Sequence, residues 1–358
     1  MLDPNPGPVI HVQALRLWLL CVAGMIVLTL AVGGITRLTE SGLSITEWKP
    51  VTGVLPPFGA RAWEEEFKAY QAIPQYQELN RGMSLAAFKV IYWWEWTHRM
   101  LARATGLVFL VPFLVFLWRG RVPKPLRRRL WTIFTCGALL GVVGWWMVAS
   151  GLAGSDRVNV SPYRLAFHLT LACAIYAAVV WTAQQLGARH RIEVAPRLRI
   201  GAGAIAGLLL LQIYLGALVA GTRAGLAYNT WPLIDGALIP GSAQLWPLVP
   251  AWRNVFENIL TVQFDHRMLA YAIWLAAALH AYDARRSPAA GRALLLAGAV
   301  TAQAALGIAT LLLQAPLALA LAHQLAAIAV LTIAVVHAER TGSRAAFSFA
   351  ATPKRVPA

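Results

Sequence analysis

Charge and cysteine are both scarce in this chain of 358 residues. Only 13% of the residues are charged, whereas soluble globular proteins have about a quarter. With only three cysteines, a disulfide-stabilised secreted scaffold is not expected, and because they form no Cys-x-x-Cys pair a structural zinc site is not expected either. Hydrophobic residues make up 58% of the chain and the mean hydropathy is +0.58, which excludes a disordered chain. The composition therefore indicates a polytopic membrane protein.

Eight apolar segments follow one another along the chain. Seven of them meet or nearly meet the length of about 20 residues that a helix needs to cross a bilayer. The eighth, Met268–Tyr282, is shorter but continues through Asp265-His266-Arg267. The sequence therefore predicts an all-α protein of eight transmembrane helices, with both ends of the chain on one side. The other seven predicted spans are Leu17–Thr36, Met100–Trp118, Leu130–Leu152, Leu165–Leu186, Ile200–Ala220, Ala293–Leu313 and Leu317–His337.

The net charge of +16 is divided unevenly between the two sides. The two chain ends and the connections after the second, fourth and sixth helices carry 18 basic and four acidic residues. Cytoplasmic loops carry the excess of lysine and arginine, so both termini are expected in the cytoplasm. The cytoplasmic side then has a net charge of +14 and the outer side +2. The charge is thus a topology signal, and no nucleic-acid partner is expected.

The outer connection between the first two helices, residues 37–94, is long. It holds most of the acidic residues of the outer side, including Glu64-Glu65-Glu66. A connection of this length usually has structure of its own. Ser84 is expected to cap a helix that runs through Phe88 into the second span, so that this helix protrudes from the membrane.

An internal repeat divides the chain into two halves. Phe88–Ala102 aligns without gaps to Phe256–Ala270, and seven of the 15 positions are identical, including His-Arg-Met-Leu-Ala. Shorter matches pair Thr36-Arg37 with Thr222-Arg223 and Leu165–His168 with Ala320–His323. The sequence thus predicts two four-helix bundles of like orientation, related by an axis along the membrane normal. The expected divisions are a tail (1–16), a first half (17–190), a second half (191–340) and a tail (341–358).

Four of the eight histidines occupy equivalent positions of the repeat near the outer ends of their helices: His98, His168, His266 and His323. Ionisable groups at membrane depth are costly and usually functional. Two imidazoles from opposed helices of a bundle suit the two axial positions of a haem iron. The expected haem-iron ligands are His98 with His168 and His266 with His323. A structural histidine bonded to a backbone carbonyl is the alternative for each one, and the remaining histidines are assigned no role.

Four arginines lie beside these positions: Arg37, Arg99, Arg223 and Arg267. Haem carries two propionates, and arginine binds carboxylates through strong, often bidentate hydrogen bonds. The four arginines are therefore expected to anchor outward-pointing propionates. The alternative is that their side chains simply reach the membrane interface.

The two halves differ in the residue that lies three positions before the first of their two matched histidines. Glu95 precedes His98 by three residues and shares its helix face, whereas Gln263 holds the equivalent place in the second half. A carboxylate there can accept protons or direct a water molecule. The first half is therefore interpreted as reactive, with Glu95 as its catalytic residue, and the second as a fixed electron-transfer haem. The alternative is an interfacial glutamate paired with Arg99 or Arg103.

At these residues the chain resembles the haem A synthase family, the membrane enzymes of terminal-oxidase cofactor assembly. The resemblance implies oxidation of a methyl group of haem O to a formyl group, which gives haem A. It also implies haem O as substrate in the first half, haem b as cofactor in the second, and Glu95 as a functional glutamate. It rests on the four histidines and on Gly33–Arg37, Ser41–Pro50, Gly53–Pro57 and Glu95-x-x-His98-Arg99.

The chain departs from some bacterial members, because its outer loops have no cysteine pairs. The resemblance is to the proteobacterial and mitochondrial branch, and the expected location is a bacterial plasma membrane with the active sites toward the periplasm. The implied partners are the lipid bilayer, haem O, a haem O synthase and an unnamed electron acceptor. The small residues of the fifth and seventh helices permit close packing within the chain or in a homo-oligomer.

Two other functions use the same features. A dihaem cytochrome b that relays electrons, for example from quinol, would need the four histidines but not Glu95. A haem carrier or transporter of two similar halves would need helices broken near the midplane. Pro112 is the only proline in the middle of the second span, and the sixth helix has no matching break.

Overall fold

The computed structural model describes residues 8–152, 154–187 and 192–342, and in this part of the chain the secondary structure is helical, with one isolated β-bridge between Ile234 and Ala237. Eight of the described helices have 23 residues or more, as the sequence predicts. They are α1 (Pro8–Leu38), α4 (Leu85–Trp118), α5 (Lys124–Val148), α6 (Pro162–Gln185), α7 (Pro196–Thr222), α11 (Ile259–Ala284), α12 (Ala290–Leu312) and α13 (Leu317–Thr341).

Seven of these helices are long and apolar enough to cross a membrane. The helix outside this set is α11, which contains the predicted span Met268–Tyr282. It has 26 residues, but its outer part carries polar groups, among them Gln263, Asp265 and Arg267. These groups lower its mean hydropathy, whereas its length lies between those of its neighbours α7, with 27 residues, and α12, with 23.

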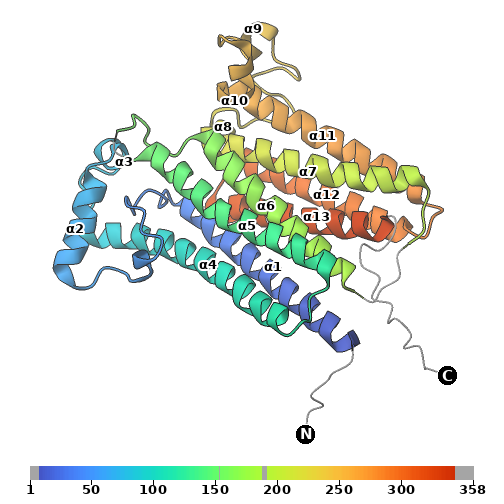
Figure 1. Cartoon of the computed structure of the whole chain (residues 1–358). Helices are drawn as coiled ribbons and strands as arrows, with labels where there is room; N and C mark the ends of the chain where they lie inside the picture. The colour runs from blue at the N-terminus through green and yellow to red at the C-terminus, as the bar shows by residue number, and fades with distance from the viewer. Residues whose placement is uncertain (1–7, 153, 188–191, 343–358) are drawn as a thin grey trace.

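Several helices are longer than the predicted spans. The first helix begins at Pro8 rather than Leu17, because helical hydrogen bonds continue into polar flanks that hydropathy does not mark. The predicted cap of α4 is confirmed: Ser84 Oγ accepts a hydrogen bond from the Ala87 backbone N–H at 3.2 Å. The helix then runs without a break into the second span, so its first turns extend beyond the bundle (Figure 1).

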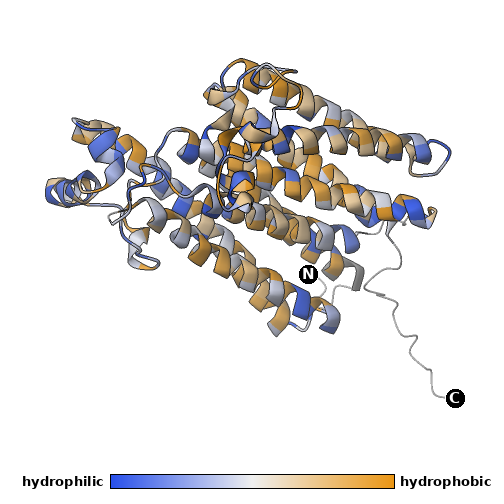
Figure 2. Cartoon of the chain, turned by 90° about the horizontal axis from the view of Figure 1, so that it is seen from above, coloured by the Kyte–Doolittle hydropathy of each residue, from blue (hydrophilic) through white to orange (hydrophobic). Residues whose placement is uncertain are grey.

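The long helices form two groups of four that meet along α1, α6, α7 and α13 (Figure 1). On one side of this centre lie α4 and α5, and on the other lie α11 and α12. Apolar residues cover most of the helix surfaces, and polar ones gather at both ends (Figure 2). Leu19, Leu126, Leu130, Val179 and Leu331 are fully buried in the half of the bundle where α1 begins and α13 ends. The four repeat-related histidines lie toward the opposite end.

The outer connection between α1 and α4 has the structure of its own that the sequence predicts. It contains η1 (Thr52–Val54), α2 (Gly59–Gln71) and α3 (Pro74–Glu78). Tyr70 and Phe88 are fully buried there, with ring centroids 5.3 Å apart. This aromatic cluster fixes the connection against the first turns of α4.

The corresponding connection of the second half is also structured. It contains α8 (Ala224–Ala227), α9 (Ser242–Leu245), η3 (Ala251–Arg253) and α10 (Asn254–Glu257). The buried Asn254 side chain donates to the carbonyls of Leu248 and Ala251, both at 2.9 Å. Both connections lie at the end of the bundle opposite to the one where α1 begins and α13 ends (Figure 1).

Candidate functional site

The tertiary structure brings the four repeat-related histidines together as two pairs. His98 of α4 and His168 of α6 lie close enough for their rings to interact electrostatically, and so do His266 of α11 and His323 of α13. All four side chains are half-buried and keep accessible surface. The pairs are those expected from the sequence, and each joins two different helices of one half.

Each of the four imidazole rings lies against a glycine of a neighbouring helix. A Cβ atom at that glycine would approach the ring to 3.1 Å or less, so a side chain there would displace the histidine. No pattern in the sequence marks these glycines, because each lies on a different helix from the histidine that it contacts. The contacts are Gly33 with His98 (2.8 Å), Gly144 with His168 (3.1 Å), Gly216 with His266 (3.0 Å) and Gly307 with His323 (2.8 Å).

Each histidine of the second pair, His266 and His323, also contacts a glutamine side chain. Gln212 Nε2 lies 3.0 Å from His266 Nδ1 and donates to the His266 carbonyl at 3.0 Å. Gln303 Nε2 lies 3.2 Å from His323 Nδ1 and donates to the His323 carbonyl at 2.9 Å. Each glutamine precedes the contacting glycine by one helical turn.

Glu95 lies at the junction of α4 and the outer connection, where its side chain is only 2% exposed. Its Oε2 atom accepts hydrogen bonds from Ser44 Oγ and from the Ile45 backbone N–H, both at 2.8 Å. Its Oε1 atom accepts from Arg99 at 2.7 Å. The carboxylate is thus paired with Arg99, while Arg103 donates to the carbonyls of residues 49 and 50.

Arg99 and Arg267 hold the two outer connections in the same manner. Besides Glu95, Arg99 donates to the Ile45 carbonyl at 2.9 Å and to the residue 47 carbonyl at 3.2 Å. Arg267 donates to Gln263 Oε1 at 3.2 Å and to the carbonyls of residues 228 and 233 at 3.1 and 3.2 Å. The carboxylate and the amide therefore occupy equivalent places in two matching networks.

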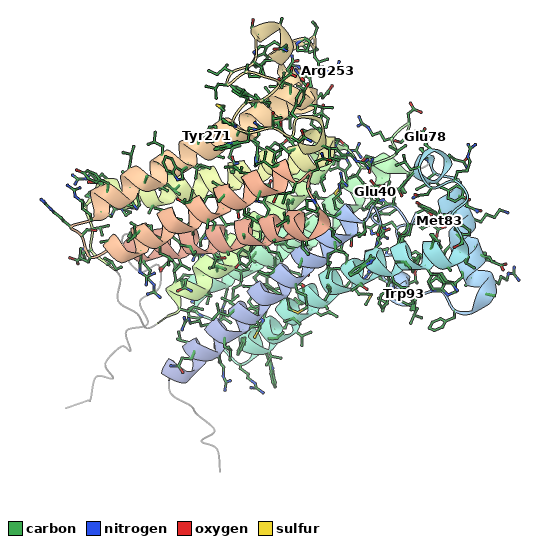
Figure 3. All side chains as sticks on the ribbon, turned by 180° about the vertical axis from the view of Figure 1, so that it is seen from behind. Glu40, Glu78, Met83, Trp93, Arg253 and Tyr271 are labelled. Carbon is green, nitrogen blue, oxygen red and sulfur yellow. The ribbon has the colours of Figure 1, made fainter. Side chains whose placement is uncertain are left out.

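Arg37 and Arg223 connect the two halves to each other. Arg37 donates to the Ala220 carbonyl at 2.9 Å. Arg223 forms an ion pair with Glu40, which is labelled in Figure 3. Glu40 and Arg223 lie 183 positions apart and share a left-handed backbone, with φ values of 56° and 55°. The same spacing relates Gly33 to Gly216. A spacing of 183 residues pairs Arg37 with Ala220. The sequence repeat instead pairs Arg37 with Arg223, which lies about one helical turn further along the chain.

Two buried guanidinium atoms near the site have no hydrogen-bond partner within the described residues: Nε of Arg37 and Nε of Arg267. Burying a donor without a partner is costly. A carboxylate oxygen would satisfy such a donor, so these atoms suit a haem propionate.

A cavity of about 420 Å³ opens between the outer connection and α4. Its lining includes Tyr92, Arg99, Arg103 and Glu66. Lys49 also lines it, and a hydrogen bond to Glu47 holds the pKa of Lys49 above its ordinary value. The cavity therefore presents both charge signs directly beside the Glu95 network.

His280 and His337 were assigned no role from the sequence, yet they bond to each other. Their Nε2 atoms lie 2.8 Å apart, and both side chains are buried. On α11, His280 follows His266 by 14 residues, which corresponds to about 21 Å of helix. The side chain of His11 and all of His190 lie outside the described residues. His280 and His337 are therefore a separate structural pair.

The donor set fits haem better than a bare metal ion. Within the described residues, no group of three or more histidine, cysteine, aspartate or glutamate side chains could hold a metal ion. Two imidazoles contributed by two different helices would suit a haem iron as ligands. His168 Nδ1 is buried and has no partner among the described residues.

Comparison with known proteins gives one consistent result. The COX15-CtaA family model, described as cytochrome oxidase assembly protein, matches residues 16–335. The chain is 60% identical over 335 residues to a "Heme A synthase" of Bradyrhizobium diazoefficiens, which covers 93% of this chain and 92% of the relative. It is 56% identical over 354 residues to a "Heme A synthase" of Rhodopseudomonas palustris, covering 98% and 97%. The chain therefore belongs to the COX15-CtaA family of cytochrome oxidase assembly proteins.

Proposed function

We propose that this chain is a haem A synthase, which oxidises a methyl group of haem O to the formyl group of haem A. Its identity to relatives of that name covers almost the whole chain. The structural observation that carries the proposal is the difference between two otherwise matching networks. One histidine pair has a buried carboxylate beside it, Glu95, and the other has the neutral Gln263.

The substrate haem O is assigned to the first half, between His98 and His168. A resident haem b is assigned to the second half, between His266 and His323. When bound, the haem iron supplies the redox chemistry, and the protein holds its axial ligands and orients the macrocycle. The close histidine pairs and their glycine contacts support this arrangement.

Glu95 is proposed as the functional carboxylate of the first half. Three of its roughly four acceptor positions are filled by Ser44, Ile45 and Arg99. These donors fix the orientation of the carboxyl group. Glu95 would thus place one free acceptor position beside the substrate, where it can direct a water molecule.

Arg37, Arg99, Arg223 and Arg267 are proposed to face the propionate side of the two haems. The unpartnered Nε atoms of Arg37 and Arg267 support this role directly. Arg99 and Arg267 also hold the outer connections in place through backbone carbonyls. Through these two arginines, binding of a propionate would therefore affect the position of the outer connections.

The chain is proposed to cross a bacterial plasma membrane eight times, with α11 as the remaining span and both ends in the cytoplasm. The position of α11 between α7 and α12, and its 26 residues, support a full crossing. The repeated glycine–histidine contacts support two related halves, 17–190 and 191–340. The charge of +14 on the proposed cytoplasmic side supports an orientation in which both haem sites face the periplasm.

The proposed partners follow from the reaction. Haem O has to be delivered by a haem O synthase, and oxidation of its methyl group needs an electron acceptor. The cavity beside Glu95 is on the outer side and is lined by both charge signs, which suits entry of water. A homo-oligomer is compatible with the small residues exposed on α7 and α12.

The test is pigment analysis of the purified chain from a host that makes haem O. The wild-type protein is expected to yield haem A together with retained haem b. The double variant His98→Ala with His168→Ala should retain haem b and yield neither haem O nor haem A. A wild-type protein that binds two b-type haems and forms no haem A would instead indicate an electron-relaying cytochrome b.

A further inference from the structure

The side-chain amides of Gln212 and Gln303 touch the histidines of the second half in the same way. Each Nε2 atom lies within 3.2 Å of the ring Nδ1 atom and within 3.0 Å of the same histidine's carbonyl oxygen. Both glutamines are partly buried between helices, Gln212 on α7 and Gln303 on α12. A single amide therefore contacts both the ring and the backbone of each proposed haem ligand.

The equivalent positions of the first half cannot make this contact. The spacing that relates Gly33 to Gly216 places Thr29 at the position of Gln212, and Thr29 donates to the Met25 carbonyl at 2.8 Å. The spacing that relates Gly144 to Gly307 places Leu140, which has no polar atom, at the position of Gln303. In the described part of the chain, no amide side chain lies within hydrogen-bonding distance of His98 or His168.

The helices also pack more closely around the His266–His323 pair than around the His98–His168 pair. In the second half, α11 lies closely along α12. In the first half, α4 makes much sparser contact with α5. The histidines of the second half are therefore held both by side-chain hydrogen bonds and by a closed ring of helices.

Hydrogen bonds to the second ring nitrogen decide how firmly a histidine holds a metal. An imidazole that binds iron through Nε2 carries its proton on Nδ1, and a partner for that proton fixes the ring and strengthens the ligand. The Oε1 atoms of both glutamines are buried and have no partner within the described residues. In this structure the amide nitrogen faces Nδ1. Rotating the amide by half a turn would bring the unpartnered Oε1 acceptor to a protonated Nδ1, in exchange for the hydrogen bond to the histidine carbonyl.

We propose that Gln212 and Gln303 are positioning residues that hold His266 and His323 as permanent haem ligands, and that their absence beside His98 and His168 allows the haem of the first half to exchange. The inference rests on the proposed function, because it assigns a retained cofactor to one half and a substrate to the other. An enzyme that converts one haem into another has to release its product while it keeps its cofactor. The glutamines provide a physical basis for that difference.

The first test measures haem loss from the purified full-length protein in detergent, with excess apomyoglobin as the acceptor. Gln212→Leu and Gln303→Leu should each release haem b about 10- to 100-fold faster than the wild-type protein. Gln324→Leu is the matched control: this glutamine follows His323 on α13, but it donates to the Leu30 carbonyl at 2.8 Å and touches no haem ligand. Its haem b release should equal that of the wild-type protein.

The second test separates positioning from general loosening of the fold. Loss of a partner at Nδ1 makes imidazole a weaker electron donor, so the haem b midpoint potential should rise in Gln212→Leu. Gln212→Glu keeps an acceptor oxygen at the same place, so it should restore slow release and give a potential at or below that of the wild-type protein. A variant that is merely less well packed would not show opposite changes in these two substitutions.

The third test adds the missing amide to the first half. Leu140→Gln should slow the release of haem O from the His98–His168 pair and leave haem b release unchanged. The inference is overturned if the wild-type protein retains haem b but all glutamine variants release both haems at the wild-type rate. A wild-type protein without any retained haem b would overturn the haem assignment of the proposed function as well.

Discussion

Glu40 and Arg223 form an ion pair although they hold the same place in the two halves of the chain. Glu40 lies two residues after the end of α1 and Arg223 directly follows α7, and both have a left-handed backbone conformation. Arg37 lies beside them and donates to the Ala220 carbonyl at 2.9 Å. The outer ends of the two halves are therefore joined by opposite charges at equivalent positions.

Reversing one charge of this pair should destabilise the protein, and reversing both should restore it. Glu40→Arg places a third guanidinium beside Arg37 and Arg223. The two groups are partly exposed, 35% and 41%, so the pair itself is worth about 0–1 kcal/mol. Thermal unfolding in detergent should show a lower melting temperature for Glu40→Arg and recovery in the double variant with Arg223→Glu. Equal melting temperatures for the single and double variants would show that the pair does not join the halves.

Removing the Glu95 carboxylate should stop haem A formation without loss of haem b. Glu95→Gln copies the natural state of the second half, where Gln263 also accepts a hydrogen bond from Arg267. The amide keeps the contact with Arg99 but loses the charge, and its NH2 group meets the Ile45 N–H. We expect haem O or a partly oxidised form to accumulate, as measured by chromatography of extracted haems. The reverse substitution, Gln263→Glu, is the matched control and should not abolish haem A formation. Normal haem A formation in Glu95→Gln would rule out a catalytic role.

The glycines that contact the histidines should tolerate no side chain. A Cβ atom at Gly33 or Gly307 would lie 2.8 Å from a ring, so alanine there has to push the haem ligand aside. Gly33→Ala should reduce haem O binding in the first half, and Gly307→Ala should reduce haem b content in the second. Each effect should be about 10-fold or more, which is the size typical of changes to residues that support a metal ligand. Haem content per protein, from pyridine haemochrome spectra, is the measurement.

Each of these glycines has a matched control on the same helix. Gly24 on α1 and Gly298 on α12 have no atom within 4 Å of an added Cβ. Alanine at these positions also raises helix propensity by about 1 kcal/mol. Gly24→Ala and Gly298→Ala should therefore leave haem content unchanged. Equal effects at Gly298 and Gly307 would argue against a steric role of the histidine contact.

Loss of one ligand should empty only the half to which it belongs. His266→Ala and His323→Ala should each remove the resident haem b signal, whereas His98→Ala should leave it in place. His337→Ala is the control, because this histidine bonds to His280 far along α11 from His266. Optical and electron paramagnetic resonance spectra of purified variants distinguish these outcomes. A bis-histidine spectrum that persists in both second-half variants would contradict the pairing.

The eighth crossing can be tested by the location of its ends. Reporter fusions after α11 and after α12 should report opposite sides of the membrane, because the proposed topology places residues 285–289 in the cytoplasm and residues 313–316 in the periplasm. A reporter at residue 342 should again report the cytoplasm. The same side for the first two fusions would show that α11 does not cross the membrane.

The sequence by itself determined the helical membrane architecture and much of the site. Long apolar segments have few alternatives in a bilayer, since every backbone polar group needs an internal partner. The repeat around His98 and His266 predicted which histidines pair, because identical polar residues at membrane depth are improbable without a function. The Ser84 cap was predictable for a local reason: its hydrogen bond spans three residues.

Only the tertiary structure decided the contacts that cross between helices. The glycines at the histidines, the amides of Gln212 and Gln303, and the bond between His280 and His337 join residues far apart in sequence. No helical periodicity encodes which turn of one helix faces which turn of another. The ion pair between Glu40 and Arg223, and the left-handed backbone of both residues, likewise appear only in the tertiary structure. Packing between helices, and not local pattern, fixed how each haem ligand is held.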